Sequence, residues 1–314
     1  MTSHPLTVPV AGTAVRTTWT GLPASVRALI EGYVGGQVVH AESQDSGFTP
    51  GFASLLTLAD GRRAFVKAAD EATQPVFTAS YREEVRKVTR LPAEAPVPRL
   101  LWSHEADGWV LLGFEAVDGR PPARPWRTDE LTRVVECVGA MASVLTPAPD
   151  GLALPTWADA MIGDVDRWVG LRHDPAMIRH GDAAAALACD AVVAGTGDSL
   201  VHCDLRDDNI LVGAHDVWIC DWNWPVRGAA WIDLLTVLLS ARGDGHDVDA
   251  ILALSPVTTD VPRDDIDAVL ALLTGYFFTA MTDETPSTSP WIRIHQRWYA
   301  EVTWAWLRER RGWT

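Results

Sequence analysis

The sequence lacks several features that would place it in a special class of protein. It has four cysteines without C-x-x-C spacing, so no disulfide framework is expected. No apolar run approaches the ~18 residues that a membrane-spanning helix needs. The first 30 residues show no basic start followed by an apolar stretch, which is the mark of a secretory signal. These absences predict a soluble, cytoplasmic protein without a membrane partner.

Positive charge is also scarce. Asp and Glu number 41 against 26 Lys and Arg, which gives a net charge of −15, and only Lys67 and Lys87 are lysines. A protein this acidic does not hold a phosphate backbone by bulk electrostatics, so a nucleic-acid partner is not expected. Solubility is the simpler interpretation of the charge, and attraction of cations is the alternative. The 314 residues are enough for one large domain or two lobes that share a cleft.

The first half of the chain predicts a small sheet with one inserted helix. Residues 1–20 are polar and rich in threonine, which predicts little order, and a helix is expected over 22–33. Glycine-containing turns at Asp60-Gly61 and Asp107-Gly108 indicate two hairpins. The extended segments and the helix are predicted, in chain order, at 37–41, 52–58, 63–68, 80–91 (the helix), 100–103 and 109–114.

The second half is dominated by helical periodicity. Residues 118–127 are rich in proline and glycine and predict a connection between lobes. Asp129 is positioned to cap a helix that runs to residue 145. Further helices are predicted at 157–170, 182–194, 229–241, 263–281 and 290–310, with one strand pair at 210–212 and 217–220. The pattern predicts an α+β protein with an N-terminal lobe at 1–116 and a helical C-terminal lobe at 117–314.

The residues with the clearest chemical pattern surround that strand pair. Asp204 and Asn209 lie on the loop that enters it, and Asp221 lies where it ends. Because a tight hairpin returns the chain to its starting point, Asp221 is expected close to Asn209. A carboxylate and an amide oxygen are hard ligands that suit Mg²⁺ carried with a nucleotide. Asp204 would stand beside that metal as a base or orienting group for a hydroxyl.

The spacing H-x-D-x-x-x-x-N, followed by an Asp after the next hairpin, resembles the protein-kinase-like phosphotransferases. The chain looks like a member of the aminoglycoside phosphotransferase family, which also contains choline, homoserine and methylthioribose kinases. The resemblance covers about residues 22–310 and is most specific over 199–235. It implies a two-lobed protein-kinase-like fold and ATP-dependent transfer of a phosphoryl group to a small molecule, with GTP left open as the donor.

The resemblance also implies roles on the loop and after it. Asp204 is the expected base, and Arg206 is expected to neutralise charge on the transferred phosphoryl group. His202 is expected to support the loop by bonding backbone near Asp221, and Asp233 to anchor it. Related chains often have glycine at the position of Cys203, so the cysteine is a departure from the family pattern.

For the nucleotide, the resemblance requires a lysine on the third strand and a glutamate on the next helix. Lys67 lies on the third predicted strand. Glu83 and Glu84 both follow on the helix, and Glu84 is preferred because it shares the register of the apolar positions Val88 and Leu91. As an exposed pair in an open cleft, Lys67 and Glu84 would contribute about 0–1 kcal/mol to folding.

Two further segments are assigned to the nucleotide by position. Residues 44–51 join the first two strands, and the resemblance implies that backbone N–H groups near Ser46 and Gly47 meet the phosphates. Residues 111–119 are similar to the hinge of the family, where backbone groups near Glu115 and Val117 would bond the adenine edge.

The acceptor is the least defined part of the prediction. The helical half is rich in carboxylates, which would suit a cationic antibiotic such as an aminoglycoside or basic peptide, but which are equally explained as helix-start charges. These are Asp244, Asp247, Asp249, Asp264, Asp265, Asp267, Asp283 and Glu284. A metabolite kinase acting on an amino alcohol or a sugar, and a nucleotide-binding regulatory protein, are the alternatives. A protein kinase is disfavoured because residues 221–233 are too short for a peptide platform. A monomer or a homodimer is expected. The sequence leaves open whether the protein serves resistance, biosynthesis or primary metabolism.

Overall fold

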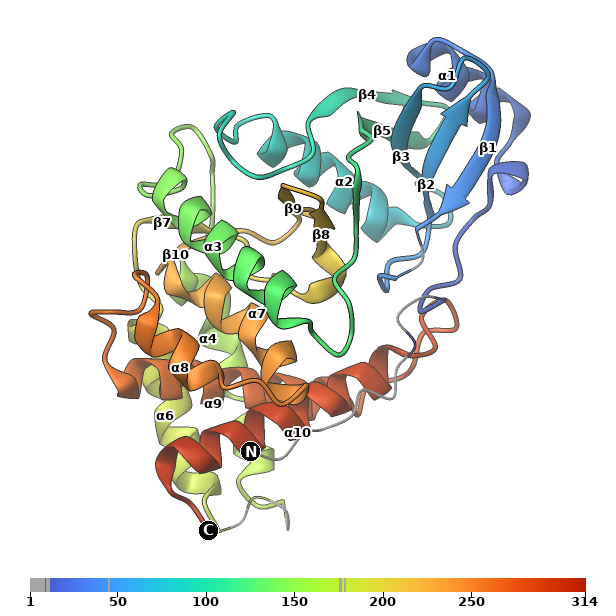
Figure 1. Cartoon of the computed structure of the whole chain (residues 1–314). Helices are drawn as coiled ribbons and strands as arrows, with labels where there is room; N and C mark the ends of the chain where they lie inside the picture. The colour runs from blue at the N-terminus through green and yellow to red at the C-terminus, as the bar shows by residue number, and fades with distance from the viewer. Residues whose placement is uncertain (1–8, 10–11, 45, 175–176, 178) are drawn as a thin grey trace.

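Residues 38–115 form a five-stranded antiparallel sheet in the computed structural model, which describes residues 9, 12–44, 46–174, 177 and 179–314. The strands lie in the order β1-β2-β3-β5-β4, so β3 lies in the middle of the sheet (Figure 1). Their bounds are β1 Val38–Ser43, β2 Phe52–Leu58, β3 Arg63–Asp70, β4 Leu100–Ala106 and β5 Trp109–Glu115.

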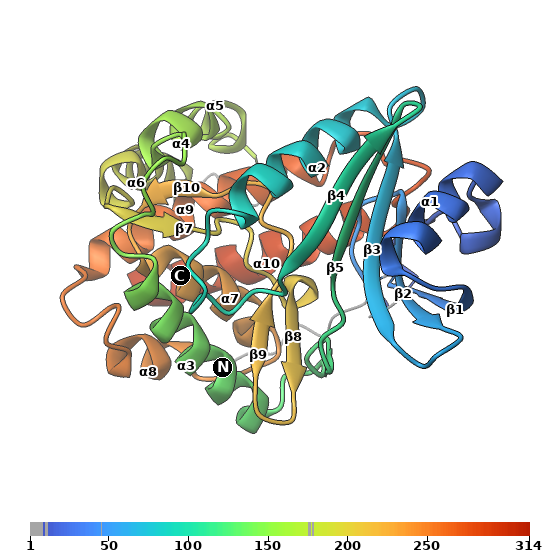
Figure 2. The same ribbon diagram turned by 90° about the horizontal axis from the view of Figure 1, so that it is seen from above.

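Two helices cover opposite faces of this sheet (Figure 2). Side chains alternate between the faces of a strand. Val66 of β3 therefore packs in one cluster with α1 (Ala24–Val34), and Leu112 of β5 packs in another with Tyr81 of α2 (Pro75–Val88). Lys67 follows Val66 and points to the α2 side. The strand period thus decides that the lysine meets α2.

The rest of the chain is mainly helical and is built around α7 (Trp231–Gly243), whose thirteen residues are all buried. Two small sheets complete it, with the strand orders β6-β8-β9 and β10-β7. The other helices are α3 Thr128–Val144, α4 Trp157–Val165, α5 Trp168–Leu171, α6 Gly181–Ala194, α8 Val248–Leu254, α9 Arg263–Ala280 and α10 Ile292–Arg311. The strands are β6 Gly119–Arg120, β7 Ser199–Val201, β8 Ile210–Gly213, β9 Val217–Ile219 and β10 Val226–Gly228.

The predicted order of elements is confirmed, and several details are wrong. The helix predicted at 80–91 begins five residues earlier, at Pro75, a residue favoured in the first turn of a helix. Arg127, not Asp129, occupies the N-cap of α3. The helix predicted over 157–170 is divided into α4 and α5, and α8 and the strands β6, β7 and β10 were not predicted. Short elements carry too few residues for their period to stand out. The lobe boundary between 116 and 117 stays a prediction.

The segment before α1 is more ordered than its composition predicts, although residues 1–8, 10 and 11 lie outside the described part. Thr13 is buried and its hydroxyl donates to the Gly47 carbonyl at 2.7 Å. The Val15 amide donates to the Thr288 carbonyl at 2.8 Å. Residues 12–17 therefore link the loop between β1 and β2 to the segment before α10.

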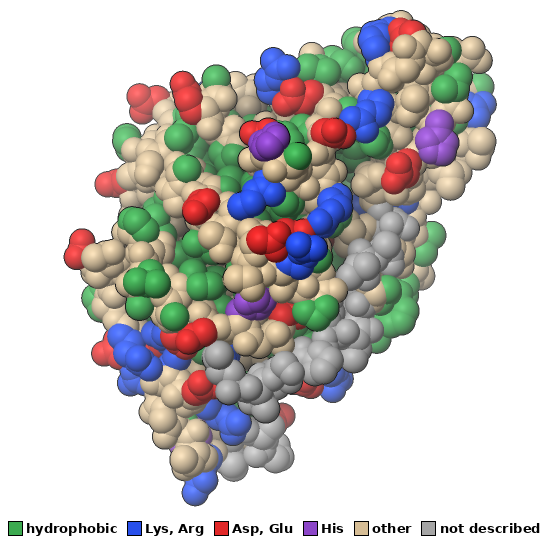
Figure 3. Space-filling model, in the orientation of Figure 1, with side chains coloured by type: hydrophobic (Ala, Val, Ile, Leu, Met, Phe, Trp, Pro, Cys, Tyr) green, Lys and Arg blue, Asp and Glu red, His purple; other side chains and the backbone are tan. Residues whose placement is uncertain are grey.

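None of the helices in the described ranges is long and apolar enough to span a lipid bilayer. Figure 3 shows acidic and basic side chains scattered over one face of the molecule, without a broad patch of one sign.

Candidate active site

A cavity of about 290 Å³ lies between the sheet and the helical half of the chain. It brings together residues that are far apart in sequence. The predicted site residues that line it are Ser46, Gly47, Lys67, Glu115, Val117, Asp204, Arg206, Asn209 and Asp221. Asp45, in the predicted phosphate loop, lies outside the described residues. The predicted phosphate loop (44–51) and the segment similar to the family's hinge (111–119) thus contribute to the walls of the cavity. The side chains of Asp204, Asn209 and Asp221 face the same space.

Lys67 lies at the centre of an ion-pair network. Its Nζ atom is 2.8 Å from both carboxylate oxygens of Glu84 and 2.9 Å from Oδ1 of Asp221. Glu84 lies beneath the lysine and is buried, whereas Glu83 faces solvent and pairs with Arg86. The preference for Glu84 as the inward-facing glutamate is confirmed.

The Lys67–Glu84 pair of this network is buried, which corrects the expectation of an exposed pair. The Lys67 and Glu84 side chains are 12% and 2% exposed. Burial alone would lower the pKa of Lys67, but the Asp221 and Glu84 carboxylates outweigh it and raise that pKa. Burial likewise works to raise the pKa of Asp221, and the Lys67 charge reverses the effect and lowers it. Lys67 is therefore charged, as is Asp221, at neutral pH.

The side chains of Asp233 and His202 fix the loop that precedes β8 by hydrogen bonds to the backbone. Both oxygens of Asp233, in the first turn of α7, accept backbone N–H groups, from His202 at 2.8 Å and from Cys203 at 3.0 Å. The Nε2–H of His202 donates to the Cys220 carbonyl at 2.9 Å, beside Asp221. These are the contacts that the resemblance implies for His202 and Asp233.

Cys203 has a φ of +68°, in the left-handed region that favours glycine. This backbone conformation gives a physical reason for the glycine that the resemblance implies at this position. The two hydrogen bonds to Asp233 hold the cysteine there despite its Cβ atom. Burial also raises the pKa of the Cys203 thiol, so the sulfur has little nucleophilic character.

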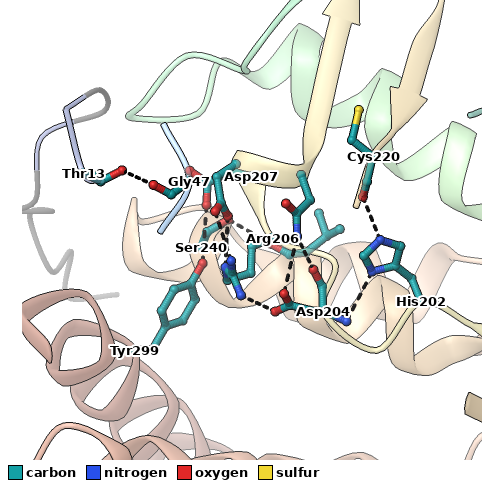
Figure 4. A network of polar contacts seen from close by, with 12 residues as sticks. Thr13, Gly47, His202, Asp204, Arg206, Asp207, Cys220, Ser240 and Tyr299 are labelled. Atoms are coloured by element: carbon teal, nitrogen blue, oxygen red, sulfur yellow. Dashed lines mark hydrogen bonds and ion pairs between the residues drawn. The ribbon is translucent and has the colours of Figure 1, made fainter. Parts of the chain in front are cut away.

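Asp204 faces the cavity from this loop, between Arg206 and His202 (Figure 4). Arg206 forms an ion pair with Asp204 and a two-pronged pair with Asp208, in which both N···O distances are 3.0 Å. Burial raises the pKa of Asp204 to about 6, and the neighbouring Arg206 charge only partly opposes this. The carboxylate is therefore charged at neutral pH and takes up a proton close to pH 6.

Asn209 and Asp221, the residues predicted to hold a divalent cation, both line the cavity. Asn209 lies in this loop and donates from Nδ2 to the Asp204 carbonyl at 2.8 Å, so its amide is oriented by the backbone. Asp221 directs Oδ1 to Lys67 and to Nδ2 of Asn223. One carboxylate and one amide suit Mg²⁺ that takes its remaining ligands from phosphates and water. Within the described ranges, three or more His, Cys, Asp or Glu side chains nowhere gather as metal ligands.

Two basic residues at the site were missed by sequence reasoning. Arg16 lines the cavity, and its Nη2 atom would be 3.3 Å from a Cβ atom built on Gly47, so the guanidinium lies under the predicted phosphate loop. Lys87 is buried, and its Nζ donates to the Asn223 carbonyl at 2.5 Å. The polar segment around Arg16 carried no motif, and the scarcity of lysine was the available signal for Lys87.

A second, larger cavity of about 1160 Å³ adjoins the first. It lies among α2, α4, α9, α10 and the loop of Asp204. Asp204 and Arg206 line both cavities, as do Val76 and Trp224. The two cavities therefore meet at the carboxylate of Asp204.

The acidic residues expected to surround an acceptor are elsewhere. None of the eight carboxylates named for the helical half lines the second cavity. Five of the eight form ion pairs with arginines, four of them with arginines that are remote in sequence, which explains much of their number without a cationic ligand. The pairs are Arg124–Asp244, Arg310–Asp249, Arg310–Asp267, Arg311–Asp264 and Arg293–Asp283.

Residues 51–259 match the sequence profile of the phosphotransferase enzyme family, and this match covers more than half of the chain. The chain belongs to this phosphotransferase family. No curated protein sequence matches it significantly.

Solved structures of small-molecule kinases share the fold of this phosphotransferase family member. A choline/ethanolamine kinase family protein from Mesorhizobium loti is 13% identical, with a TM-score of 0.58 over 91% of this chain and 93% of that one. Choline kinase LicA from Streptococcus pneumoniae is 14% identical, with a TM-score of 0.57 and coverage of 90% and 100%. A ternary complex of an aminoglycoside phosphotransferase APH(4)-Ia mutant with ADP and hygromycin B is 13% identical, with a TM-score of 0.55 and coverage of 91% and 98%. The predicted α+β, protein-kinase-like fold is confirmed.

Proposed function

We propose that the protein is an ATP-dependent O-phosphotransferase that acts on a hydroxyl group of a small molecule. One observation carries the proposal: Asp204 lies where the cavity that holds Lys67, Asn209 and Asp221 meets a second cavity large enough for an acceptor. A donor in the first cavity and an acceptor in the second would meet beside this carboxylate. Effective phosphoryl transfer depends chiefly on such positioning and on charge stabilisation.

In this proposal the acceptor oxygen bonds to the γ-phosphorus as the bond from phosphorus to the bridging oxygen of ADP breaks. Asp204 orients the hydroxyl and receives its proton, and Lys67 holds the α- and β-phosphates. Ser46 and Gly47 cover the phosphates, and backbone at Glu115 and Val117 bonds the adenine edge. Arg16 and Arg206 add positive charge at the phosphate end.

Asn209 and Asp221 would hold Mg²⁺, which supplies charge neutralisation on the phosphates when bound. Similar proteins are described with nucleotides: the APH(4)-Ia complex holds ADP, and an amicoumacin kinase, 13% identical with a TM-score of 0.51, holds AMP-PNP and Ca²⁺. The lobe division at 116 and 117 belongs to the same proposal.

The proposal is tested with the full chain, MgATP and a panel of hydroxylated antibiotics, amino alcohols, sugars and alkyl glycosides. We expect ADP formation that depends on an acceptor, with a phosphorylated product detected by mass spectrometry. Asp204→Asn should lower the rate by about 10²–10⁴-fold, because the proton acceptor is lost. MgATP binding should change little, because Lys67, Asn209 and Asp221 remain and Asp208 still holds Arg206.

The alternative function is that of a nucleotide-binding regulatory protein, and the same experiment distinguishes it from a phosphotransferase. It would bind MgATP and show no acceptor-dependent turnover with any compound of the panel. An Asp204→Asn variant as active as the wild type would contradict the role of this carboxylate.

A further inference from the structure

The charged side chains that line the second cavity already have partners within the protein. Of the described residues, three carboxylates line it, and each pairs with an arginine two or three positions later in the chain: Glu83 with Arg86, Asp164 with Arg167, and Asp204 with Arg206. An acceptor with several ammonium groups would have to compete with these guanidinium groups. The cavity therefore offers no carboxylate that is set aside for a cation.

The basic groups of the cavity are engaged as well. Lys87 donates to a backbone carbonyl, and Arg206 is held by Asp208. Burial lowers the pKa of His295 to about 4, so this ring is neutral at physiological pH. The lining thus carries no unpaired positive charge that would select an anion, among the residues that the structure describes.

Three of the aromatic rings that line the cavity, Tyr276, Phe277 and Tyr299, do not form an open cage for a cation. The Arg167 guanidinium lies 5.0 Å from the centroid of Tyr276 and takes the position that a ligand cation would use. Tyr299 is stacked on Phe277 at 4.9 Å, with 16° between the ring planes. Recognition of a quaternary ammonium group by these rings is therefore disfavoured.

The remaining lining is largely apolar and comes from several elements. Met161 of α4, Leu273 of α9 and Ile292 of α10 contribute to it. At the mouth, Val76 and Trp224 are 68% and 64% exposed. Large apolar side chains left open to water at the border of a cavity are typical of a site that an apolar ligand covers.

We infer that the acceptor is a neutral molecule with a large apolar body, which fills the second cavity and presents one hydroxyl group to Asp204. This inference rests on the proposed function. It replaces the expectation of a cationic antibiotic, because the carboxylates on which that expectation was based pair with arginines or lie outside the cavity. The hydroxyl identifies the reacting end, and the apolar body supplies the affinity.

The test measures binding of butyl, hexyl and octyl β-D-glucoside, below their micelle concentrations, to the full chain in the presence of MgADP. Choline serves as the cationic probe. Burial of each methylene should tighten binding by up to about fourfold, at ~0.8 kcal/mol per CH₂. Calorimetric dissociation constants that fall along the series are expected, with no saturable binding of choline.

Two substitutions on one helix locate the bound chain. Met161→Glu places a carboxylate in the cavity, whereas Ile162→Glu places one on a neighbouring residue that is 60% exposed and does not line it. Met161→Glu should weaken octyl glucoside binding by at least about tenfold, because an unpaired charge is unfavourable in an apolar site. Ile162→Glu should change it little. Ala160→Glu, at an exposed position that also lines the cavity, replaces Met161→Glu if the latter does not fold.

The two probes distinguish the two kinds of acceptor. A cationic acceptor would be bound by the unaltered cavity, so saturable binding of choline by the wild type overturns the inference. Glucoside binding that is absent, independent of chain length or insensitive to Met161→Glu also overturns it. If one of these results is obtained but the chain binds MgATP and phosphorylates another compound, the proposed function still holds. A chain that binds glucosides but neither binds MgATP nor transfers phosphate contradicts the proposed function instead.

Discussion

At the residue scale, the contacts of Lys67 separate its structural role from its proposed catalytic one. Lys67→Met removes the charge that faces the buried carboxylate of Glu84 and the partly buried carboxylate of Asp221. Breaking a buried pair by removing one partner destabilises a protein by about 3–5 kcal/mol. We therefore expect a large loss in the free energy of unfolding, measured by urea denaturation, together with a fall in transfer rate of about 100-fold or more.

A second substitution distinguishes the two effects. Glu84→Gln in the Lys67→Met background removes the more deeply buried of the two carboxylates that lose Lys67, so a large part of the stability should return. The transfer rate should stay low, because no cation holds the phosphates. Recovery of both properties in the double variant would show that Lys67 serves only the fold.

The raised pKa of Asp204 predicts how the reaction depends on pH. Burial raises this pKa to about 6, and only the ionised carboxylate can accept the proton of the acceptor hydroxyl. The rate should therefore be constant above this pKa and fall tenfold per pH unit below it. The measurement is the pH profile of kcat/KM with the best acceptor of the panel. A profile with no inflection between pH 5 and 7 would contradict the assignment, and a ¹³C NMR titration of the carboxyl gives an independent value.

At the element scale, the loop that carries Asp204 is positioned by the N-terminal turn of α7. Asp233→Asn replaces one acceptor oxygen with an amide that faces a backbone N–H. The buried, unsatisfied donor should lower the free energy of unfolding by about 1–3 kcal/mol. Because the loop then loses its support, kcat should fall while the KM for ATP changes less.

Asp182→Asn is the matched control for Asp233→Asn. Asp182 also lies in the first turn of a helix, α6, but it is exposed. Its favourable interaction with the helix dipole is worth about 0.3–1 kcal/mol, and no effect on the rate is expected. Equal effects of the two substitutions would show that Asp233 acts through the helix terminus alone.

Site residues whose separation is set by local structure can be predicted from the sequence, whereas pairs between distant segments cannot. Asp204, Asn209 and Asp221 can be predicted because a short hairpin fixes their separation locally. Lys67 is predicted from the resemblance, which requires a lysine on the third strand, and helical register selects Glu84 over Glu83. The sequence left the role of the helical half's carboxylates open, because most of the arginines that pair with them are distant in sequence. Arg124 and Asp244, for example, are 120 residues apart, and no local sequence pattern predicts such an ion pair.

At the scale of the whole molecule, both lysines connect the sheet half to the segment that follows β9. Lys67 of β3 reaches Asp221, and Lys87 of α2 reaches the Asn223 carbonyl. A flexible, compact ammonium group suits such contacts in a chain whose other cations are arginines. The two lysines thus help to fix the width of the cleft in which a nucleotide would bind.

Lys87→Met tests this role of the lysines, because it keeps the apolar stem and removes the ammonium group. The Asn223 carbonyl then loses a charged donor in a buried position, so we expect the free energy of unfolding to fall by about 1–3 kcal/mol. Binding of MgADP, measured by calorimetry, should also weaken. Asn223 donates to Oδ1 of Asp221 at 2.6 Å, so a displacement of Asn223 after the loss of Lys87 would also displace the Asp221 carboxylate. Arg86→Met, on the same helix, removes an exposed pair with Glu83 and an exposed hydrogen bond to the Ala153 carbonyl. It should cost about 0–1 kcal/mol and leave the binding of MgADP unchanged. If Lys87→Met loses stability but binds MgADP as tightly as the wild type, the contact stabilises the fold without setting the geometry of the cleft.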